Sequence, residues 1–372
     1  MLRLTSKKKT GDVVGLHIEA GSVAAAQVRS NGSVEVVGAA IGPVAPGAFN
    51  EGEVADNELL ADALKELFAK NKLSKQVRLG IGNQRVVVRS LRLPVIEDPK
   101  EMEAAVRFQA QEHVPMPLEE AVLEHQVVGG TPGGEESSPQ VDVVVVAARR
   151  DMVSAVLDPL RKAGLEPVGV DLSAFGMIRA LSGVDPEAGA VSVPAEGGEA
   201  TDPATVQPGG AILYCNIGDA MNLAVAKGRG CLFTRVAATG LEGITGRLAA
   251  ASGLTTEHAT QWLMHVGLDR PLEQVEGDSQ VVSDARRTLE EGVHGLVDEL
   301  RLSLDYYGAQ EGAVPVGRIV LSGPGSAIPG LPERMQTGLT VPISVARPPA
   351  LSAYDQGAAA RLTVPYGLAL ED

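Results

Sequence analysis

Three glycine-containing segments of the sequence have the composition of turns that could hold a phosphate group. They are Gly21-Ser22, Gly218-Asp219 and the run from Gly323 to Ser326, which includes Gly325. Because glycine has no Cβ, a turn built on it exposes main-chain N–H groups that can donate hydrogen bonds to phosphate oxygens. Each segment taken singly is more simply interpreted as a turn that requires glycine. Their order along the chain favours a nucleotide site, with two turns around a polyphosphate and the third over the adenine or ribose.

The first two turns lie in a pattern of strands that occurs twice. Residues 13–28 are predicted as a strand, a turn and a strand, and the hairpin signal Asn31-Gly32 leads to another strand at 34–38. Strands at 211–217, 223–226 and 231–236 repeat this order. A single repetition at a separation of about 200 residues indicates two homologous lobes rather than a solenoid.

Helix signals divide the rest of the chain. Asp56 is predicted to cap a helix at 57–70, Asp98 to cap a helix that ends at His113, and Asp151 to cap a helix that ends before Gly164. We expect a small inserted unit to begin at Pro94. Further predicted elements are strands at 77–81, 86–91, 124–128, 141–148, 168–172, 318–321 and 343–346, and helices at 174–181, 241–251, 256–266 and 284–307.

Composition limits the classes of function. The chain has 372 residues, 44% of them hydrophobic, and a net charge of −15. Such an acidic chain would repel nucleic acid, so no nucleic-acid partner is expected. No apolar run is long enough to span a bilayer, so no direct membrane insertion is expected. The lack of a span and of a secretory signal predicts a cytoplasmic protein. Cys215 and Cys231 fit this prediction as buried thiols of a reducing compartment, with one disulfide between them as the alternative.

Other combinations of reactive residues are weak. The six histidines show no spacing typical of a metal site, so no metal-binding residue is assigned. Ser22 has no histidine and aspartate in an arrangement that predicts a catalytic triad. We therefore assign no catalytic residue.

Seven segments resemble, in order and spacing, those of the PilM family of type IV pilus assembly proteins. The first is the Gly15–Ser22 turn, and the second is Glu51–Asp56 before the first helix. The others are Arg89–Pro94, Phe108–Pro115, Ala163–Pro167 with Val170-Asp171, Leu232–Arg235 and Ile319–Gly323. Together they cover nearly the whole chain.

The resemblance implies an α/β protein with the actin-like, ribonuclease H-like duplicated fold. It implies two lobes around a nucleotide cleft and a small inserted α+β subdomain. The expected first lobe is 11–182, with the insertion at about 94–165, and residues 183–210 form a flexible linker. The expected second lobe is 211–372, with a helical subdomain at about 241–300.

The resemblance also implies a function. Proteins similar to PilM are cytoplasmic scaffolds rather than enzymes, held at the inner face of the membrane by the N-terminal peptide of a PilN-type protein. The residues it assigns to nucleotide binding are Gly21, Ser22, Asn216, Gly218, Gly323, Gly325 and Ser326. ATP binding and self-association are left open, and Mg²⁺ is expected only together with ATP.

Departures from the family pattern argue against hydrolysis. The acidic residue of the first turn aligns with His17 or, if the register is shifted by two, with Glu19. In the second turn an aspartate is replaced by Asn216, and Asp219 adds a negative charge. Pro324 removes an N–H from the third turn. Since actin-like ATPases need carboxylates to hold Mg²⁺ through water, we expect a degenerate ATP site.

Two alternatives share the fold. A small-molecule kinase requires a catalytic aspartate in a phosphate turn, and the alignment without gaps finds none. A filament-forming relative similar to FtsA typically ends in an amphipathic membrane helix, whereas this sequence ends Gly367-Leu-Ala-Leu-Glu-Asp. Both features favour the scaffold.

Overall fold

A computed structural model describes residues 12–30, 33–50, 52–131, 138–184, 210–310 and 312–370. The predicted turn at Asn31-Gly32 and most of the predicted linker at 183–210 lie outside these residues. The chain forms two compact units. Unit 1 consists of Met1–Arg179, Gly228–Thr234 and Pro365–Asp372, and unit 2 consists of Ala180–Lys227 and Arg235–Val364. Unit 1 thus takes two segments from the second half of the sequence.

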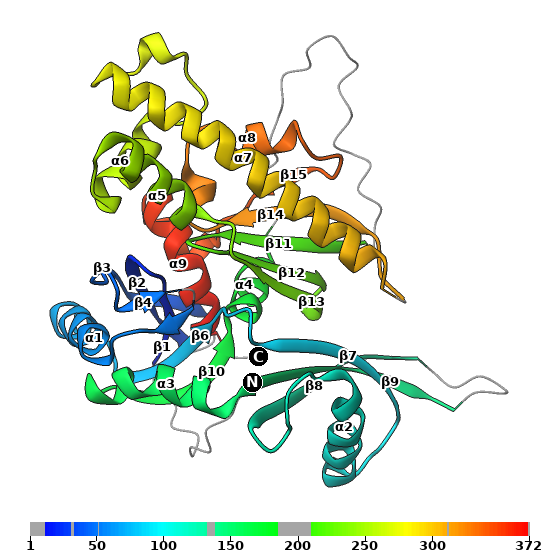
Figure 1. Ribbon diagram of the computed structural model, residues 1–372. Helices are drawn as coiled ribbons and strands as arrows, with labels where there is room; N and C mark the ends of the chain where they lie inside the picture. Colours follow the sequence, from blue (N-terminus) through cyan, green and yellow to red (C-terminus); the bar gives the residue numbers. More distant parts are fainter. Residues whose placement is uncertain are drawn as a thin grey trace. The chain divides into compact units, whose positions relative to one another are not determined.

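The centre of unit 1 is a five-stranded mixed sheet (Figure 1). Its spatial order is β10 (Glu166–Leu172), β6 (Gln76–Ile81), β1 (Val13–Ile18), β2 (Ser22–Ser30) and β3 (Val34–Pro43). β1 pairs antiparallel with β2 and parallel with β6, and β6 pairs parallel with β10. The carboxyl ends of β1, β6 and β10 therefore meet at one edge of the sheet, where the first glycine turn also lies.

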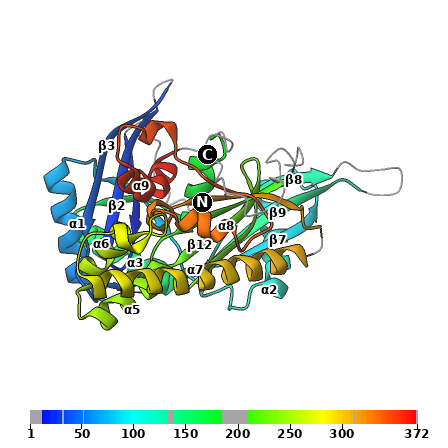
Figure 2. The same cartoon turned by 90° about the horizontal axis from the view of Figure 1, so that it is seen from above.

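One face of this sheet is covered by α1 (Asn57–Asn71) and α3 (Arg150–Lys162), which also pack against each other. Figure 2 shows α1 alongside β2 and β3. A short hairpin, β4 (Phe49–Asn50) with β5 (Glu53–Val54), precedes α1. Asp56 caps α1, as predicted, because its carboxylate accepts hydrogen bonds from the N–H groups of Glu58 and Leu59.

The prediction that Asp151 caps α3 is wrong. The helix begins at Arg150, and its N-cap position is Arg149, the last residue of β9 (Gln140–Arg149). Because the strand continues into the helix without a loop, Asp151 falls inside the first turn. Its carboxylate accepts hydrogen bonds from the Arg149 guanidinium at 2.6 and 3.0 Å and from the N–H of Met152 at 2.8 Å. Gly164 follows the helix with a φ of +75°, as predicted for its C-terminal cap.

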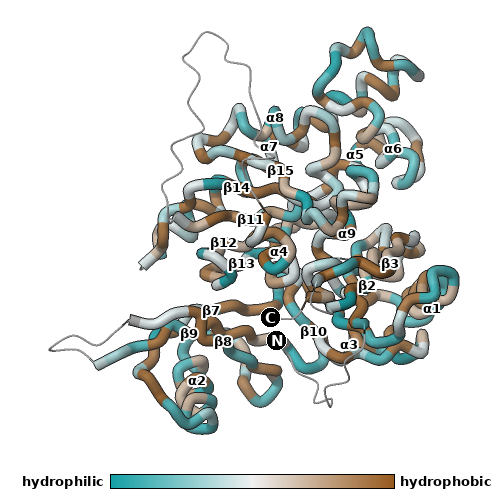
Figure 3. Tube along the Cα trace, turned by 180° about the vertical axis from the view of Figure 1, so that it is seen from behind, coloured by the Kyte–Doolittle hydropathy of each residue, from teal (hydrophilic) through white to brown (hydrophobic). Residues whose placement is uncertain are grey.

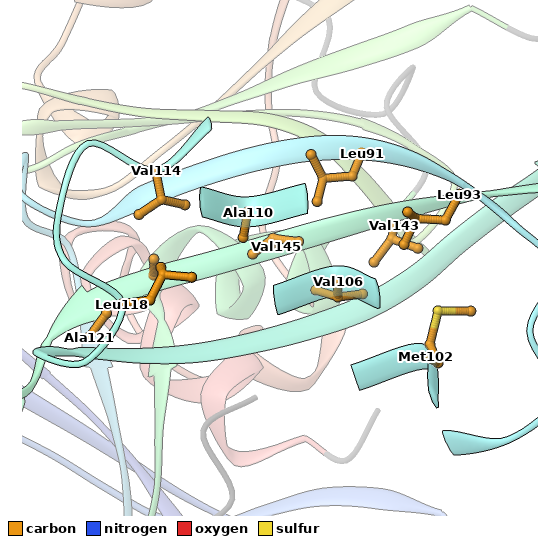
Figure 4. Close-up of a cluster of buried hydrophobic side chains, with 11 residues drawn as sticks. Leu91, Leu93, Met102, Val106, Ala110, Val114, Leu118, Ala121, Val143 and Val145 are labelled. Atoms are coloured by element: carbon orange, nitrogen blue, oxygen red, sulfur yellow. The ribbon is translucent and has the colours of Figure 1, made fainter. Parts of the chain in front are cut away.

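A smaller antiparallel sheet is inserted between β6 and β10. It consists, in spatial order, of β7 (Val87–Pro94), β9 and β8 (Ala121–Thr131), so it begins before the predicted boundary at Pro94. α2 (Pro99–His113) covers one face and is capped by Asp98, as predicted. Figure 4 shows the apolar cluster between helix and sheet. Its members are Leu91, Leu93, Met102, Val106, Ala110, Val114, Leu118, Ala121, Val143, Val145 and Ala147.

A second five-stranded sheet repeats the main sheet of unit 1, and its strands belong to unit 2 except for residues 230–234 of β13, which are counted with unit 1. Its spatial order is β13 (Gly230–Ala237), β12 (Met221–Lys227), β11 (Ala211–Ile217), β14 (Val316–Ser322) and β15 (Ile343–Val345). β11 pairs antiparallel with β12 and parallel with β14, as β1 does with β2 and β6. β14 pairs parallel with β15, as β6 does with β10. The predicted duplication is therefore confirmed by strand order and direction.

The helices of unit 2 lie between its strands in the sequence, three of them between β13 and β14 and one between β14 and β15. They are α5 (Leu241–Ser252), α6 (Thr256–Val266), α7 (Ser279–Gly308) and the short α8 (Leu331–Gln336), with 3₁₀ turns at Leu272–Gln274, Pro324–Ala327 and Pro349–Leu351. α7 begins before the predicted 284, because the Asp278 carboxylate accepts hydrogen bonds from the N–H groups of Gln280 and Val281. Cys215 and Cys231 are free, buried thiols, as predicted.

Hydropathy follows this architecture. Figure 3 shows brown, apolar colouring along the strands of both units, and longer teal segments on α1 and α2. Within the described ranges, no helix combines the length and the apolar character that crossing a membrane requires.

Two further helices carry the chain from one unit to the other. α4 (Ser173–Leu181) passes from unit 1 into unit 2 after Arg179, and α9 (Gln356–Ala369) enters unit 1 at Pro365. The last turn of α9 lies against the sheet of unit 1. A Cβ built on Gly15 would lie 1.9 Å from the Pro365 carbonyl oxygen, and one on Gly80 would lie 2.4 Å from Leu368. These glycines are therefore required by close packing of the helix on the sheet.

Two arginines bind the carboxyl end of α9. Arg78 of β6 donates hydrogen bonds to the carbonyl oxygens of Leu368 at 2.8 Å and Leu370 at 2.6 Å. Arg179 of α4 donates to the carbonyl oxygen of Gly367 at 2.9 Å and forms a salt bridge with Asp171 at 2.5 Å. The last carbonyl groups of a helix have no partners within the helix. The arginines supply them, and their positive charge is favourable at the negative end of the helix dipole.

Candidate functional site

The first glycine turn connects β1 to β2 in unit 1. The N–H of Glu19 donates to the carbonyl oxygen of Ser22 at 2.8 Å, and the N–H of Val44 donates to that of Gly21 at 3.1 Å. Gly21 is exposed, and a Cβ built on it would meet no atom within 4 Å. Packing therefore does not require glycine at this position. An open backbone at the carboxyl end of a strand can approach an anion closely.

The second glycine turn connects β11 to β12 in unit 2 and lies against the first turn of α5. The N–H groups of Leu241 and Glu242 donate to the carbonyl oxygens of Gly218 at 2.8 Å and Asp219 at 3.4 Å. A Cβ built on Gly240 would lie 2.1 Å from the Asp219 carbonyl oxygen. Two of the N–H donors at this helix end are thus used within the fold, and the turn is held in one place.

The third turn follows β14 and packs against the second. Gly323 has a φ of +81°, and a Cβ built on it would lie 2.7 Å from Oδ1 of Asn216. A Cβ on Gly325 would lie 2.3 Å from Ile217. Ser326 is buried, and both its N–H and its hydroxyl donate to the carbonyl oxygen of Gly323, at 3.0 and 2.7 Å. Packing alone therefore explains why both glycines are present.

Four of the seven predicted nucleotide-binding residues converge in unit 2. Asn216 at the end of β11, Gly323 and Gly325 after β14, and Ser326 lie around one meeting point of parallel strands. Gly218 follows directly in the second turn, whereas Gly21 and Ser22 belong to unit 1. That these residues bind nucleotide stays a prediction. Ser322 is a further candidate: its hydroxyl lies 3.5 Å from Oδ1 of Asn216, and the parallel register of the two strands is the signal that identifies it.

The duplicated sheets place one residue of each sheet at an equivalent position before its turn. His17 lies opposite Gly80 of the parallel strand β6, and Asn216 lies opposite Ser322 of the parallel strand β14. Each is followed by one isoleucine and then by the turn. His17 is therefore the residue of unit 1 that corresponds to Asn216, and Glu19 lies within the turn. His17 and Asn216 are both buried, with exposed fractions of 9% and 3%.

Asn216 is buried, with the Ser322 hydroxyl 3.5 Å from its Oδ1 and Asn222 opposite it on β12. Burial raises the pKa of Tyr214, two residues earlier on β11, to about 12, and it also raises the pKa of the Cys215 thiol. A charged carboxylate at position 216 would also lose its hydration, and the free-energy cost would have to be offset by a bound cation. In the described part of the chain, no three histidine, cysteine, aspartate or glutamate side chains are grouped so that they could hold a metal ion. An uncharged amide suits these surroundings.

Comparison with solved structures identifies the fold. A PilM–PilN type IV pilus biogenesis complex contains a chain that matches with a TM-score of 0.75 and 26% identity, over 97% of this chain and 98% of that one. The ethanolamine utilization protein EutJ of Carboxydothermus hydrogenoformans matches with a TM-score of 0.50 and 13% identity, over 96% and 88%. MreB5 of Spiroplasma citri bound to ADP matches with 0.50 and 12%, over 96% and 95%.

The latter two similarities concern the fold alone. Together with the duplicated sheets they confirm the predicted actin-like fold. The family model of the type IV pilus assembly protein PilM matches residues 15–370, which include both units and the inserted sheet. This chain therefore belongs to the PilM family of type IV pilus assembly proteins.

Proposed function

We propose that this protein is a cytoplasmic scaffold of type IV pilus assembly that binds the N-terminal cytoplasmic peptide of a PilN-type inner-membrane protein. The observation that carries the proposal is the similarity to the PilM–PilN complex over 97% of the chain. A scaffold of this kind lies at the inner face of the membrane through its partner. The absence of any helix among the described residues that could cross a bilayer is compatible with such a tether.

The proposed peptide site lies between the inserted sheet and the five-stranded sheet of unit 1. The connection between these two sheets is held by side-chain hydrogen bonds and a salt bridge. Asn83, buried after β6, donates to the carbonyl oxygen of Gly52 at 3.2 Å and accepts from the N–H of Arg85 at 2.7 Å. Arg85 also forms a salt bridge with Glu53 at 2.7 Å. These contacts fix the base of the inserted sheet, and a fixed base reduces the entropy lost when a peptide binds beside it.

The nucleotide site of this scaffold is proposed to be degenerate. Hydrolysis on the actin-like fold needs carboxylates that position Mg²⁺, and the two corresponding positions hold His17 and Asn216. The turn residues that remain could still hold a phosphate through backbone N–H groups. We therefore propose that any ATP bound is held without efficient turnover, and that the protein acts through its partners rather than as an enzyme.

Hydrogen–deuterium exchange with a synthetic peptide of the PilN-type N-terminus tests the peptide site. Binding should slow exchange in residues 82–94, which contain the Asn83 connection and β7, and leave α5 and α6 unchanged. A scrambled peptide of the same composition is the control. Protection confined to unit 2, or none at saturating peptide, would show that the proposed place is wrong.

A second measurement tests the tether in cells. The protein should fractionate with membranes when the PilN-type protein is present and lose that association when it is deleted. Equal membrane association in cells lacking every pilus inner-membrane protein would contradict the scaffold proposal.

A further inference from the structure

The helix α2 has an apolar inner face that packs on the inserted sheet and an outer face that carries an exposed aromatic residue. Met102, Val106 and Ala110 point into the apolar cluster over the small sheet (Figure 4). On the opposite side of the helix, Phe108 has 69% of its surface exposed, the largest fraction of any large hydrophobic residue in the described ranges. Phe108 is also part of the Phe108–Pro115 segment that resembles the PilM family, whose buried residues are Ala110 and Val114.

Phe108 does not contribute to the stability of the fold by packing in the apolar cluster. It adds nothing to the apolar cluster, and phenylalanine forms helices less readily than alanine or leucine. Placing a phenyl ring in water forgoes the favourable free energy of burying it. Aromatic side chains of this kind are enriched where a protein surface becomes buried in a complex.

The surface stripe that contains Phe108 also carries two glutamates. Residues three and four positions apart lie on one side of a helix, so Glu101, Ala104, Ala105, Phe108 and Glu112 form one stripe. The two alanines beside the ring project only a methyl group, so the ring stands above its neighbours. Glu101 and Glu112 are exposed about one turn beyond each end of this apolar centre.

The nearest basic residue of the helix does not neutralise the stripe. Arg107 donates a hydrogen bond to the carbonyl oxygen of Leu118 at 3.1 Å, so its guanidinium is directed toward the loop after α2. The helix therefore presents an aromatic side chain between two carboxylates. An apolar centre with a polar rim is the usual arrangement of a protein–protein contact.

We propose that the outer face of α2 is a docking surface for a protein partner with a basic surface, in which Phe108 fills an apolar pocket flanked by lysine or arginine side chains. Complementary charge identifies the partner's chemistry, because Glu101 and Glu112 attract cations and the whole chain carries a net charge of −15. A second copy of this chain fits poorly. Antiparallel pairing of two α2 helices about Phe108 would place Glu101 near the Glu112 of the other copy, and like charges repel.

This surface is separate from the proposed peptide site. Phe108 lies on the outer side of α2, whereas residues 82–94 of the proposed peptide site include β7, which packs against the inner side of this helix. The inference does not depend on the PilN-type partner, and each of the two proposals can fail while the other holds.

The experiment uses the full chain with the photo-crosslinking residue p-benzoylphenylalanine in place of Phe108. Cells are irradiated, the adduct is identified by mass spectrometry, and the partner is purified and titrated against the wild type and variants. We expect Phe108→Ala to weaken binding on the order of 30-fold or more, as truncation of a central aromatic anchor does. The double variant Glu101→Lys/Glu112→Lys should weaken it further than Phe108→Ala alone at low salt.

Matched variants on α1 provide the controls. Leu59→Ala removes another exposed apolar side chain, and Asp62→Lys/Glu66→Lys makes the same change in charge, so neither should alter the affinity. Circular dichroism checks that all variants are folded. The proposal is overturned if no adduct forms at position 108, if the only adduct is a second copy of this chain, or if the charge reversals on α1 and α2 weaken binding equally. It is also overturned if Phe108→Ala leaves the affinity unchanged.

Discussion

Arg179 of α4 and Gly367 of α9 are joined by a hydrogen bond of 2.9 Å, which connects the two helices through which the chain passes between its units. Asp171 holds the Arg179 guanidinium in place, and the side chains of this pair are only 1% and 8% exposed. Removing one member of a buried ion pair leaves the other charge without compensation. The contact therefore makes a specific prediction about stability.

Arg179→Met should lower the free energy of unfolding of unit 1 by about 3–5 kcal/mol, because the buried Asp171 carboxylate would lose its paired cation. Urea denaturation followed by circular dichroism measures the change. Arg161→Met is the matched control: Arg161 pairs with Asp158 at 3.6 Å, both side chains are more than half exposed, and its loss should cost less than about 1 kcal/mol. Similar costs for the two variants would show that the α4–α9 contact is not a major source of stability.

Gly15→Ala should destabilise the protein, and Gly21→Ala should not, although both glycines belong to the same sequence motif. A Cβ on Gly15 would lie 1.9 Å from the Pro365 carbonyl oxygen, whereas one on Gly21 meets nothing within 4 Å. Overpacking against backbone costs about 1–3 kcal/mol or more. Thermal unfolding of the two variants gives the comparison, and an equal effect on both midpoints would contradict the close approach of α9.

His17→Asp combined with Asn216→Asp should tighten ATP binding in the presence of Mg²⁺, by about tenfold or more, since it restores charge that can position the metal. Isothermal titration calorimetry measures the affinity, and a phosphate-release assay should find wild-type turnover slower than about 1 per second. His17→Asn with Asn216 retained is the uncharged control and should bind no more tightly than the wild type. If the double variant behaves like this control, the assignment of the two phosphate turns is wrong.

Asp151 should titrate far below an ordinary aspartate. The Arg149 side chain and then the N–H of Met152 stabilise its charged form and lower its pKa from 3.8 to about 2. Because the folded pKa lies below the unfolded one, ionised Asp151 stabilises the fold above about pH 4, and this contribution is lost as the pH falls toward 2. Carboxyl ¹³C NMR measures the titration directly. Arg149→Gln should return the pKa toward 3.8, and a pKa that does not respond would rule out the Arg149 contact in solution.

Local signals in the sequence predicted most elements. Asp56 and Asp98 could be predicted as caps because a carboxylate immediately before a helical pattern can accept hydrogen bonds from the free N–H groups of the first turn. The repeated strand pattern predicted the duplication, and the two sheets have the same strand order. Asp151 was misassigned because nothing local shows that β9 continues without a break into α3.

The contacts that the sequence could not predict are long-range. Arg78 and Leu368 are 290 residues apart, and neither side chain signals the other. Gly15 was interpreted as part of a phosphate turn, but its small size is needed where α9 approaches the sheet. The register of His17 was undecidable from one chain, because it depends on which residue of β6 lies opposite.

The position of the last turn of α9 also fixes an order of events during synthesis. Residues 365–370 complete the sheet face of unit 1, yet the ribosome makes them after all the strands of unit 2. Until they arrive, Gly15, Gly80 and the two arginines lack the partner that they hold in the finished protein. The nascent first half of the chain therefore keeps this part of its sheet uncovered while the second half is made, and exposed surface of this kind is what chaperones bind.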